Sequence, residues 1–263
     1  MADIYVDDAF GTAHRDNASM YTVPLMMEGK DRVIGFLIEK EMKFLGKTVN
    51  NAERPFVAIL GGAKVSDKIG VIENLLEKVD RILIGGAMAY TFFKAQGLSI
   101  GKSLCEDGFL DQADALLKQA EKSGCEMILP VDNIVAREIK ANAEHKVVDD
   151  CQIDSDWEGL DIGPATEKLF AEKLADARTI VWNGPMGVFE VEPFNSGTNA
   201  VAQAVAEATA NGAKSIIGGG DSASAIKILG LENSVSHIST GGGASLEFLE
   251  GKKFKCLEIL DEK

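Results

Sequence analysis

The sequence predicts an α/β protein built on a doubly wound parallel sheet, and three of its features carry that prediction. Short apolar runs rich in valine and isoleucine alternate with longer segments whose apolar residues recur every three or four positions. Four of these runs end in glycines, where a parallel sheet presents its ligand-binding edge. The chain has 263 residues, which is enough to bury a full core as one large domain with an added piece.

Six strands are expected in the main part of the chain, each short and bounded by glycine or proline. They are 56–60, 81–86, 126–130, 179–184, 215–220 and 236–242. Helical periodicity fills the intervals, at 66–77, 88–96, 108–123, 165–175, 197–210, 222–229 and 243–250. This alternation is typical of a Rossmann-like, three-layer α/β/α arrangement.

The N-terminal residues do not join the alternation. The stretch "DIYVDDAFGTAHR" suggests one strand and a loop without a partner strand, so we expect residues 1–30 to be poorly anchored. A helix over 33–46, closed by Gly46, would connect them to the main part of the chain.

Composition excludes several classes of protein. The net charge of −14 disfavours nucleic acid and anionic membranes as partners, so an anionic ligand needs a local cluster of donors. No apolar run approaches the ~18 residues that span a bilayer, and the start of the sequence lacks a secretory signal. We expect a cytoplasmic monomer. Four widely spaced cysteines indicate free thiols and not a metal or redox site: Cys105, Cys125, Cys151 and Cys256.

Glycine-rich loops at the expected strand ends are the strongest functional signal. Five loops belong to this set: 60–64, 84–88, 182–190, 216–222 and 239–245. Each one alone would also suit a helix cap or a turn, but together, at the carboxyl ends of parallel strands, they predict a nucleotide site. Neither a G-x-G-x-x-G fingerprint nor a P-loop motif is present, which disfavours a dinucleotide and a Walker-type site.

Lys64 and Lys68 stand four residues apart where the first expected strand gives way to a helix. On one helical face, both ammonium groups would reach a single polyphosphate. A solvated surface pair is the alternative, but lysines near a helix N-terminus oppose the macrodipole, which favours an anionic partner.

Several other residues leave alternatives open. Asp221 suits either a helix cap or a Mg²⁺ ligand beside phosphates, and the hydroxyl of Ser222 suits either a phosphate contact or an N-terminal cap. We expect structural roles for His145 and His237. Solvated roles are the default for two acidic residues of one loop, Glu190 and Glu192.

Through a set of motifs that contain most of these residues, the chain closely resembles phosphoglycerate kinase. The motifs run in the family's order from residue 4 to about 251: "DAFGTAHR" (8–15), "GFLIEKE" (35–41), "ILGGAKVSDKI" (59–69), "GLDIGP" (159–164), "VWNGPMGVFE" (181–190), "IIGGGDS" (216–222) and "VSHISTGGGASLE" (235–247). The resemblance implies two doubly wound domains in a whole family member, of which this chain matches the later part. It implies an N-terminally truncated chain with a remnant of the substrate domain, an interdomain helix, a nucleotide-binding domain and a C-terminal tail, at 1–32, 33–47, 48–251 and 252–263.

The resemblance also implies roles for individual residues. The residues around the nucleotide would be Ala63, Lys68, Gly86, Gly159, Leu160, Asn183, Val188, Glu190, Gly219, Gly220, Asp221 and Ser222. Asp221 would hold Mg²⁺, while Lys64 and the N–H groups of Gly242 and Gly243 would stabilise the transferred phosphoryl group. Arg15 would belong to the phosphoglycerate site. Three positions depart from the family pattern: Ala87 for a glycine, Asp8 for an asparagine and Asn17 for a histidine.

The function implied is glycolytic phosphoglycerate kinase: reversible, Mg²⁺-dependent phosphoryl transfer between ATP and 3-phosphoglycerate. Phosphoryl transfer relies on positioning and charge neutralisation, which suits lysines and glycines without a catalytic histidine. The alternative is a nucleotide-binding fragment that holds Mg-ATP or Mg-ADP without catalysis. We expect 3-phosphoglycerate to bind only when the missing N-terminal half is supplied, because Arg15 alone cannot rebuild its site.

Overall fold

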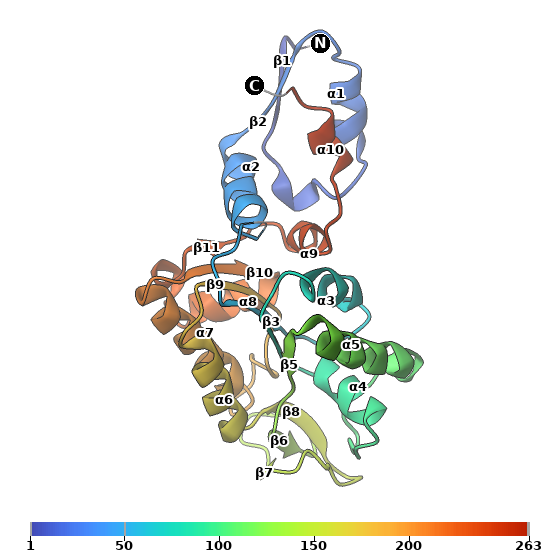
Figure 1. Ribbon diagram of the computed structural model, residues 1–263, viewed down its shortest axis with the longest axis vertical. Coiled ribbons are helices and arrows are strands. Elements are labelled where there is room, and N and C mark those ends of the chain that lie inside the picture. Colours follow the sequence, from blue (N-terminus) through green and yellow to red (C-terminus); the bar gives the residue numbers. More distant parts are fainter. Residues whose placement is uncertain (1, 50, 262–263) are drawn as a thin grey trace.

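The computed structural model describes residues 2–49 and 51–261, which form a larger and a smaller lobe. Figure 1 shows the larger lobe below, with a sheet between helices, and the smaller lobe above, where both ends of the chain lie. The expected domain ranges also include residues 1, 50, 262 and 263, which lie outside the described residues. The domain boundaries themselves remain a prediction.

The larger lobe is built on six parallel strands in the order β11-β10-β9-β3-β4-β5. They are β3 (Phe56–Leu60), β4 (Arg81–Ile84), β5 (Glu126–Ile128), β9 (Thr179–Asn183), β10 (Lys214–Gly218) and β11 (His237–Ile238). The chain winds outward from β3 to β5 and, on the other side, from β9 to β11, so the sheet is doubly wound. The predicted fold class and all six predicted strands are confirmed, although most of the terminal glycines lie in the turns beyond the strands.

Helices cover both faces of this sheet, which gives the expected three layers. They are α3 (Ile69–Leu75), α4 (Met88–Ala95), α5 (Leu110–Ser123), α6 (Pro164–Leu174), α7 (Ser196–Ala210), α8 (Gly220–Ile228) and α9 (Gly243–Leu249). Side chains of β3 alternate between two core clusters, with Phe56, Ala58 and Leu60 facing α3, α4, α5 and α9, and Val57 and Ile59 facing α6, α7 and α8. Full burial of a valine, leucine, isoleucine or phenylalanine side chain stabilises a fold by about 1.5–3 kcal/mol, so apolar packing on both faces of the sheet holds the three layers together.

A second, smaller sheet in the larger lobe was not predicted. It is antiparallel, in the order β7-β6-β8, and consists of β6 (Asn133–Ala136), β7 (His145–Val148) and β8 (Glu158–Ile162). β7 is largely exposed and β8 is buried along most of its length, so neither shows the alternation of a half-buried strand, and β8 also contains glycine and aspartate, which are depleted in strands. This sheet matters because β8 carries Gly159 and Leu160.

In the smaller lobe, β1 (Ile4–Asp7) and β2 (Asp31–Ile34) form a two-stranded parallel sheet. The expectation of a strand without a partner is therefore wrong. The end of the partner strand, Val33 and Ile34, falls within the expected helix over 33–46, because two apolar residues in a row fit a helix as well as a strand. Short helical turns separate the strands: η1 (Phe10–Thr12), η2 (Ala18–Thr22) and α1 (Val23–Leu25).

The connecting helix begins at Phe36 and not at residue 33. It runs as α2 (Phe36–Glu41) directly into the wider π-helical turns of η3 (Met42–Thr48), so Gly46 does not end it as expected. The carboxylate of Asp8 accepts the N–H groups of Leu37 at 2.7 Å and Ile38 at 3.1 Å. Two donors at the start of α2 that have no intrahelical partner are satisfied in this way, which places the start of the helix.

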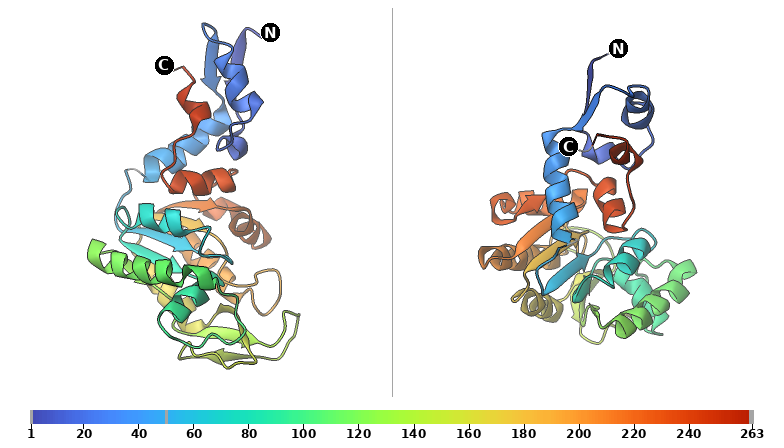
Figure 2. Two further views of the ribbon diagram at one scale, coloured as in Figure 1. Left: turned by 90° about the vertical axis from the view of Figure 1, so that its right-hand side faces the viewer. Right: turned by 45° about the horizontal axis from the view of Figure 1, so that its top comes forward.

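The C-terminal tail anchors the smaller lobe, and Figure 2 shows it alongside the N-terminal segment in both views. In α10 (Lys255–Glu258), the buried thiol of Cys256 donates to the carbonyl of Ala13 at 3.1 Å, and Lys255 pairs with Asp16 at 2.6 Å. Asp261 pairs with Arg32 at 3.0 Å and also bonds the backbone of β2. Residues 2–30 therefore have more anchoring contacts than the sequence suggested.

All four cysteines are free thiols, as expected. Within residues 2–49 and 51–261, no helix combines the length and apolar character that crossing a bilayer requires.

A buried pair, Glu41 and His237, joins the connecting helix to the end of β11. The carboxylate oxygen Oε2 of Glu41 lies 2.9 Å from Nε2 of His237, and Oε1 accepts the N–H of Thr240 at 2.8 Å and its hydroxyl at 2.9 Å. The His237 ring stacks on Phe44, with ring centroids 4.5 Å apart. Burial raises the pKa of Glu41, but hydrogen bonds from His237 and Thr240 outweigh it and leave the pKa below its ordinary value. His237 thus has the structural surroundings expected of it.

Replacing Glu41 with glutamine should lower the free energy of unfolding at neutral pH by about 1–3 kcal/mol, because buried hydrogen bonds to a charged group are lost. Since the folded-state pKa is depressed, the carboxylate stabilises the protein above its ordinary pKa of 4.5, and this contribution disappears as pH falls through the folded pKa. The difference between wild type and Glu41→Gln should therefore shrink in acid. Urea denaturation at several pH values measures it.

The matched control is Glu39→Gln, an exposed position on the same helix, which should change stability by no more than about 0.5 kcal/mol. Equal effects from the two substitutions would contradict the role given to Glu41.

Candidate functional site

The central strands end level with one another at one edge of the sheet. Leu60 at the end of β3 pairs with Ile84 of β4 and with Asn183 of β9, and Asn183 pairs with Gly218 of β10. The order of strands along the chain reverses between β3 and β9. At such a reversal the following turns diverge and leave a crevice, which is where open α/β sheets bind ligands.

The turns after β3 and β9 touch backbone to backbone. The N–H of Gly61 donates to the carbonyl of Asn183, and that of Gly62 to the carbonyl of Pro185, both at 2.9 Å. A Cβ on Gly61 would collide with the Pro185 carbonyl oxygen, and one on Gly184 with the Gly61 carbonyl oxygen. Only glycine permits this approach, and Gly184 also has a φ of 98°, which favours glycine.

A cavity of 280 Å³, here called the Lys68 cavity, lies over these turns. It brings together many of the predicted residues: Ala63, Lys64, Lys68, Asn183, Gly219, Gly220 and Asp221. The first N–H groups of α8, at Gly220 and Asp221, have no intrahelical acceptor and lie at this wall. The cavity therefore combines ammonium groups with backbone donors, as an anion site requires.

A neighbouring cavity of 290 Å³, here called the Gly159 cavity, shares Gly62, Ala63, Pro185 and Asp221 with the first. It holds all but one of the other predicted nucleotide residues, Gly86, Gly159, Leu160, Val188 and Glu190, while Ser222 lines neither cavity. Its remaining walls are largely apolar, with Tyr90, Leu104 and Ile139 among them. A polar cavity and an apolar one thus adjoin at the same edge of the sheet.

Lys68 is the buried cation of the site. Its side chain is 8 % exposed, and Nζ donates to Oδ1 of Asn183. Burial lowers the pKa of Lys68 to about 8, although nearby carboxylates, those of Asp67 and Asp221 first among them, work in the opposite direction.

The expectation that Lys64 and Lys68 share a helical face is wrong. Helix α3 begins at Ile69, so Lys68 occupies its N-cap and exposed Lys64 lies in the preceding loop. The two residues nevertheless line one cavity. Between them lies a single turn that precedes α3, in which the N–H groups of Lys68 and Ile69 both donate to the carbonyl of Val65, at 2.9 and 3.1 Å.

The structure excludes one of the two alternatives for Ser222, the N-terminal cap. Gly219 is the N-cap of α8, so Ser222 is not the cap. Its buried hydroxyl accepts the N–H of Gly184 at 2.7 Å, and this hydrogen bond ties the turn after β9 to α8. Asp221 is exposed in the first turn of α8 and lines both cavities.

Besides Ser222, three predicted site residues line neither cavity: Arg15, Gly242 and Gly243. They lie where α9 meets the smaller lobe, since Nε of Arg15 donates to Nε2 of His14 at 3.3 Å and a Cβ on Gly243 would lie 3.4 Å from that same atom. His14 was not predicted, although it precedes Arg15 in the quoted motif. These residues form a second group, separate from the cavities.

Sequence patterns also missed Tyr90 as part of the site. Its hydroxyl lies where a Cβ on Gly159 would be, and it donates to Oδ1 of Asn133 at 3.3 Å. No local pattern reveals a contact between a helix and a distant strand. Ala87, which departs from the family pattern, lines the Gly159 cavity with a φ of −65°, a value that alanine adopts freely.

The remaining predicted residues have ordinary surroundings. Nδ1 of His145 lies 3.0 Å from the carbonyl oxygen of Ala143, and its ring meets Phe194 edge-on. Glu192 is exposed, as expected, while exposed Glu190 lies at the Gly159 cavity.

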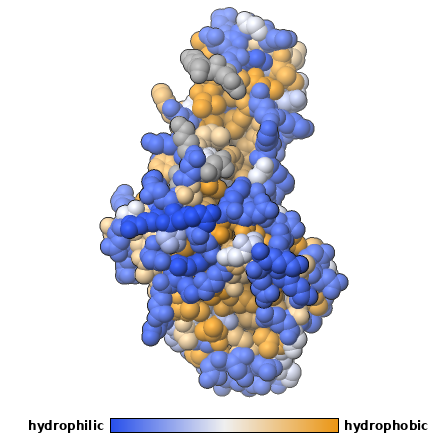
Figure 3. All heavy atoms as spheres, viewed as in Figure 1, coloured by the Kyte–Doolittle hydropathy of each residue, from blue (hydrophilic) through white to orange (hydrophobic). Residues whose placement is uncertain are grey.

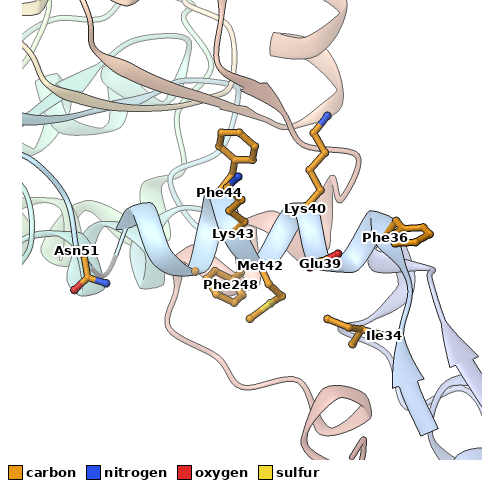
Figure 4. A pocket seen from close by; sticks show the side chains of 10 residues that line it. Ile34, Phe36, Glu39, Lys40, Met42, Lys43, Phe44, Asn51 and Phe248 are labelled. Atoms are coloured by element: carbon orange, nitrogen blue, oxygen red, sulfur yellow. The ribbon is translucent and has the colours of Figure 1, made fainter. Parts of the chain in front are cut away.

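A larger groove of 810 Å³ runs along the connecting helix, away from the predicted site residues. Figure 4 shows its apolar side chains, including Ile34, Met42 and Phe248, with Lys40 and Lys43 on the same helix. Apolar side chains also gather on the visible face of the smaller lobe in Figure 3, and Phe36 is 86 % exposed. None of the predicted phosphate-binding residues lines this groove.

Comparisons with known proteins show the family and the fold that this chain shares. A family profile described as phosphoglycerate kinase matches residues 1–252. The chain is 57 % identical to phosphoglycerate kinases of Thermosipho africanus and Clostridium perfringens, over its whole length and 65 % of theirs. Among solved structures, it is similar to phosphoglycerate kinase from Coxiella burnetii, with a TM-score of 0.93 and 46 % identity over 98 % of this chain and 65 % of that one. It is also similar to phosphoglycerate kinase from Pyrococcus horikoshii, with a TM-score of 0.79 and 35 % identity over 98 % of this chain and 64 % of that one.

Substituting Gly159 with alanine should place a methyl group against the buried Tyr90 hydroxyl, which would have to leave its position beside Asn133. We expect the free energy of unfolding to fall by about 1–3 kcal/mol, as for other overpacked cores. Gly108→Ala is the control, because a Cβ there meets nothing within 4 Å. Thermal denaturation of both variants checks this, and a fully stable Gly159→Ala protein would contradict the packing described.

Proposed function

Because the chain belongs to the phosphoglycerate kinase family, we propose that its two adjoining cavities bind one molecule of ATP or ADP for reversible phosphoryl transfer to and from 3-phosphoglycerate. The observation that carries the proposal is the convergence of Lys64, Lys68 and the start of α8 on one cavity at the reversal of strand order. The chain spans 65 % of the length of the relatives cited, so the activity of the whole protein is part of the proposal.

The chemistry of the two cavities orients the nucleotide. The ammonium groups and helix N–H donors of the Lys68 cavity suit the phosphates. The apolar walls of the Gly159 cavity, such as Leu160 and Val188, suit the base, and Glu190 suits the ribose hydroxyls. The shared residues Gly62, Ala63 and Asp221 then lie between base and phosphates.

Asp221 fits a Mg²⁺ ion bound together with the phosphates. Its carboxylate is exposed and lines both cavities, while no cluster of three His, Cys, Asp or Glu side chains suited to a metal occurs among the described residues. Mg²⁺ typically takes one or two protein carboxylates and completes its shell with phosphate oxygens and water. When bound, the ion neutralises phosphate charge.

Transfer of the phosphoryl group needs alignment and charge neutralisation more than acid–base chemistry. Lys68 donates to Asn183, which holds its ammonium group in one position. Exposed Lys64 can instead follow the phosphoryl group as that group moves. The second group of residues, Arg15, Gly242 and Gly243, lies toward the smaller lobe and suits the acceptor side of the reaction.

A second candidate function is nucleotide binding without transfer. It is favoured by one observation, that Arg15, Gly242 and Gly243 line neither cavity.

Nucleotide affinity should depend on the ammonium of Lys68. Its pKa is about 8, so the group is charged below that pH and becomes neutral above it, and phosphates bind the charged form. The dissociation constant for Mg-ADP should therefore rise as pH increases through 8, by up to about tenfold per pH unit.

In Lys68→Met, binding should be weaker by about tenfold or more and should lose this pH dependence. Isothermal titration calorimetry measures both effects, with exposed Lys122→Met as the control. An unchanged affinity in Lys68→Met would refute the phosphate assignment.

Lys64→Ala should separate the two candidate functions in an assay that couples ATP and 3-phosphoglycerate to product formation. We expect turnover by the wild type and a loss of roughly a hundredfold in the variant, with Mg-ADP affinity changed far less, because the lysine acts on the moving phosphoryl group. Saturable ADP binding without wild-type turnover would instead favour the binding-only function.

A further inference from the structure

Asp161 is a buried carboxylate outside the set of residues assigned to the nucleotide. It lies in β8 with 1 % of its surface exposed. Its Oδ2 accepts the N–H of Gly197 at 2.7 Å, and its Oδ1 accepts the N–H of Ile162 at 2.9 Å. Burial raises the pKa of Asp161 well above its ordinary value, although both N–H groups work against that rise. Such a costly group calls for a specific reason.

One role of Asp161 is to cap a helix from a distance. Helix α7 begins at Ser196, and its N-cap Asn195 makes no side-chain capping hydrogen bond. The carboxylate of Asp161 instead accepts the N–H of Gly197 in the first turn, where a negative charge also interacts favourably with the helix dipole. The start of α7 is thereby fixed to β8.

The same carboxylate is enclosed by the loop that walls the Gly159 cavity. A Cβ on Gly187 or on Gly197 would collide with Oδ1 of Asp161, so loop and helix both close on it without space for a side chain. On either side of Gly187, the loop is bonded to the same two elements. The N–H of Met186 donates to the hydroxyl of Thr198 at 3.0 Å, and the N–H of Val188 to the carbonyl of Leu160 at 2.9 Å.

We propose that Asp161 is a positioning residue for the nucleotide: it sets the register between β8, the start of α7 and the loop 185–190. Through that register, Val188 and Glu190 face the same cavity as Gly159 and Leu160. Asp161 lines neither cavity and acts through the loop. This inference rests on the proposed function for its effect on the nucleotide, but its effect on the loop stands independently.

The test compares Asp161→Asn and Asp161→Ala with wild type in two measurements. The first is amide hydrogen exchange at residues 186–190, which should accelerate by about tenfold or more in Asp161→Ala because a charge-assisted hydrogen bond and the packing around it are lost. The second is the dissociation constant for Mg-ADP, which should rise by about tenfold in Asp161→Ala and by less in Asp161→Asn, which keeps an acceptor oxygen.

Val205→Ala is the matched control. Val205 is fully buried in α7, the helix whose start Asp161 caps, and it packs in the core between α6, α7, α8 and the main sheet. The substitution should reduce stability without a selective change at 186–190 or in Mg-ADP affinity, so it separates positioning from general destabilisation. If Asp161→Ala does not fold, Asp161→Asn carries the test.

Unchanged exchange at 186–190 in a folded variant would overturn the inference, as would faster exchange with unaltered Mg-ADP affinity. Wild-type protein that does not bind Mg-ADP would refute the proposed function instead, and the exchange measurement would still decide whether Asp161 holds the loop.

Discussion

The site depends on a place where three turns approach so closely that no side chain fits between them. A Cβ on Gly61, Gly85 or Gly184 would collide with backbone or side-chain atoms of the turns beside it, and Gly62 and Gly86 donate to carbonyls of the turn after β9. This contact between backbones brings the ends of β3, β4 and β9 to a common edge and leaves a crevice above. The two cavities exist because the strand order reverses there.

Charge is the second constraint on the site. A protein with a net charge of −14 repels polyphosphates at a distance, so attraction must come from groups placed within the crevice. Lys68 supplies one such group at a cost, since burial lowers its pKa to about 8 in the absence of a ligand. A bound phosphate would favour the charged form. The burial of Lys68 is thus easier to understand in a protein that binds an anion than in one that does not.

The parts of the structure that could be predicted from the sequence are those coded locally. Parallel strands, their order of alternation with helices, and the glycine turns that carry Lys64, Lys68 and Asp221 all follow from patterns within a few residues of one another. Pairings between distant segments could not be predicted in this way. The β1–β2 pair, the small sheet of β6 to β8, Glu41 with His237, and Asp161 with Gly197 each depend on contacts that no local pattern records. Tyr90 was missed for the same reason, since its partner Gly159 lies on another element.

The most direct measurement is a crystal structure of this chain with Mg-ADP at saturating concentration. We expect the diphosphate in the Lys68 cavity, within hydrogen-bonding distance of the Lys68 ammonium and the backbone N–H groups at the start of α8, with the base against Leu160 and Val188. A nucleotide bound in the groove along the connecting helix, or phosphates that avoid Lys68, would contradict it.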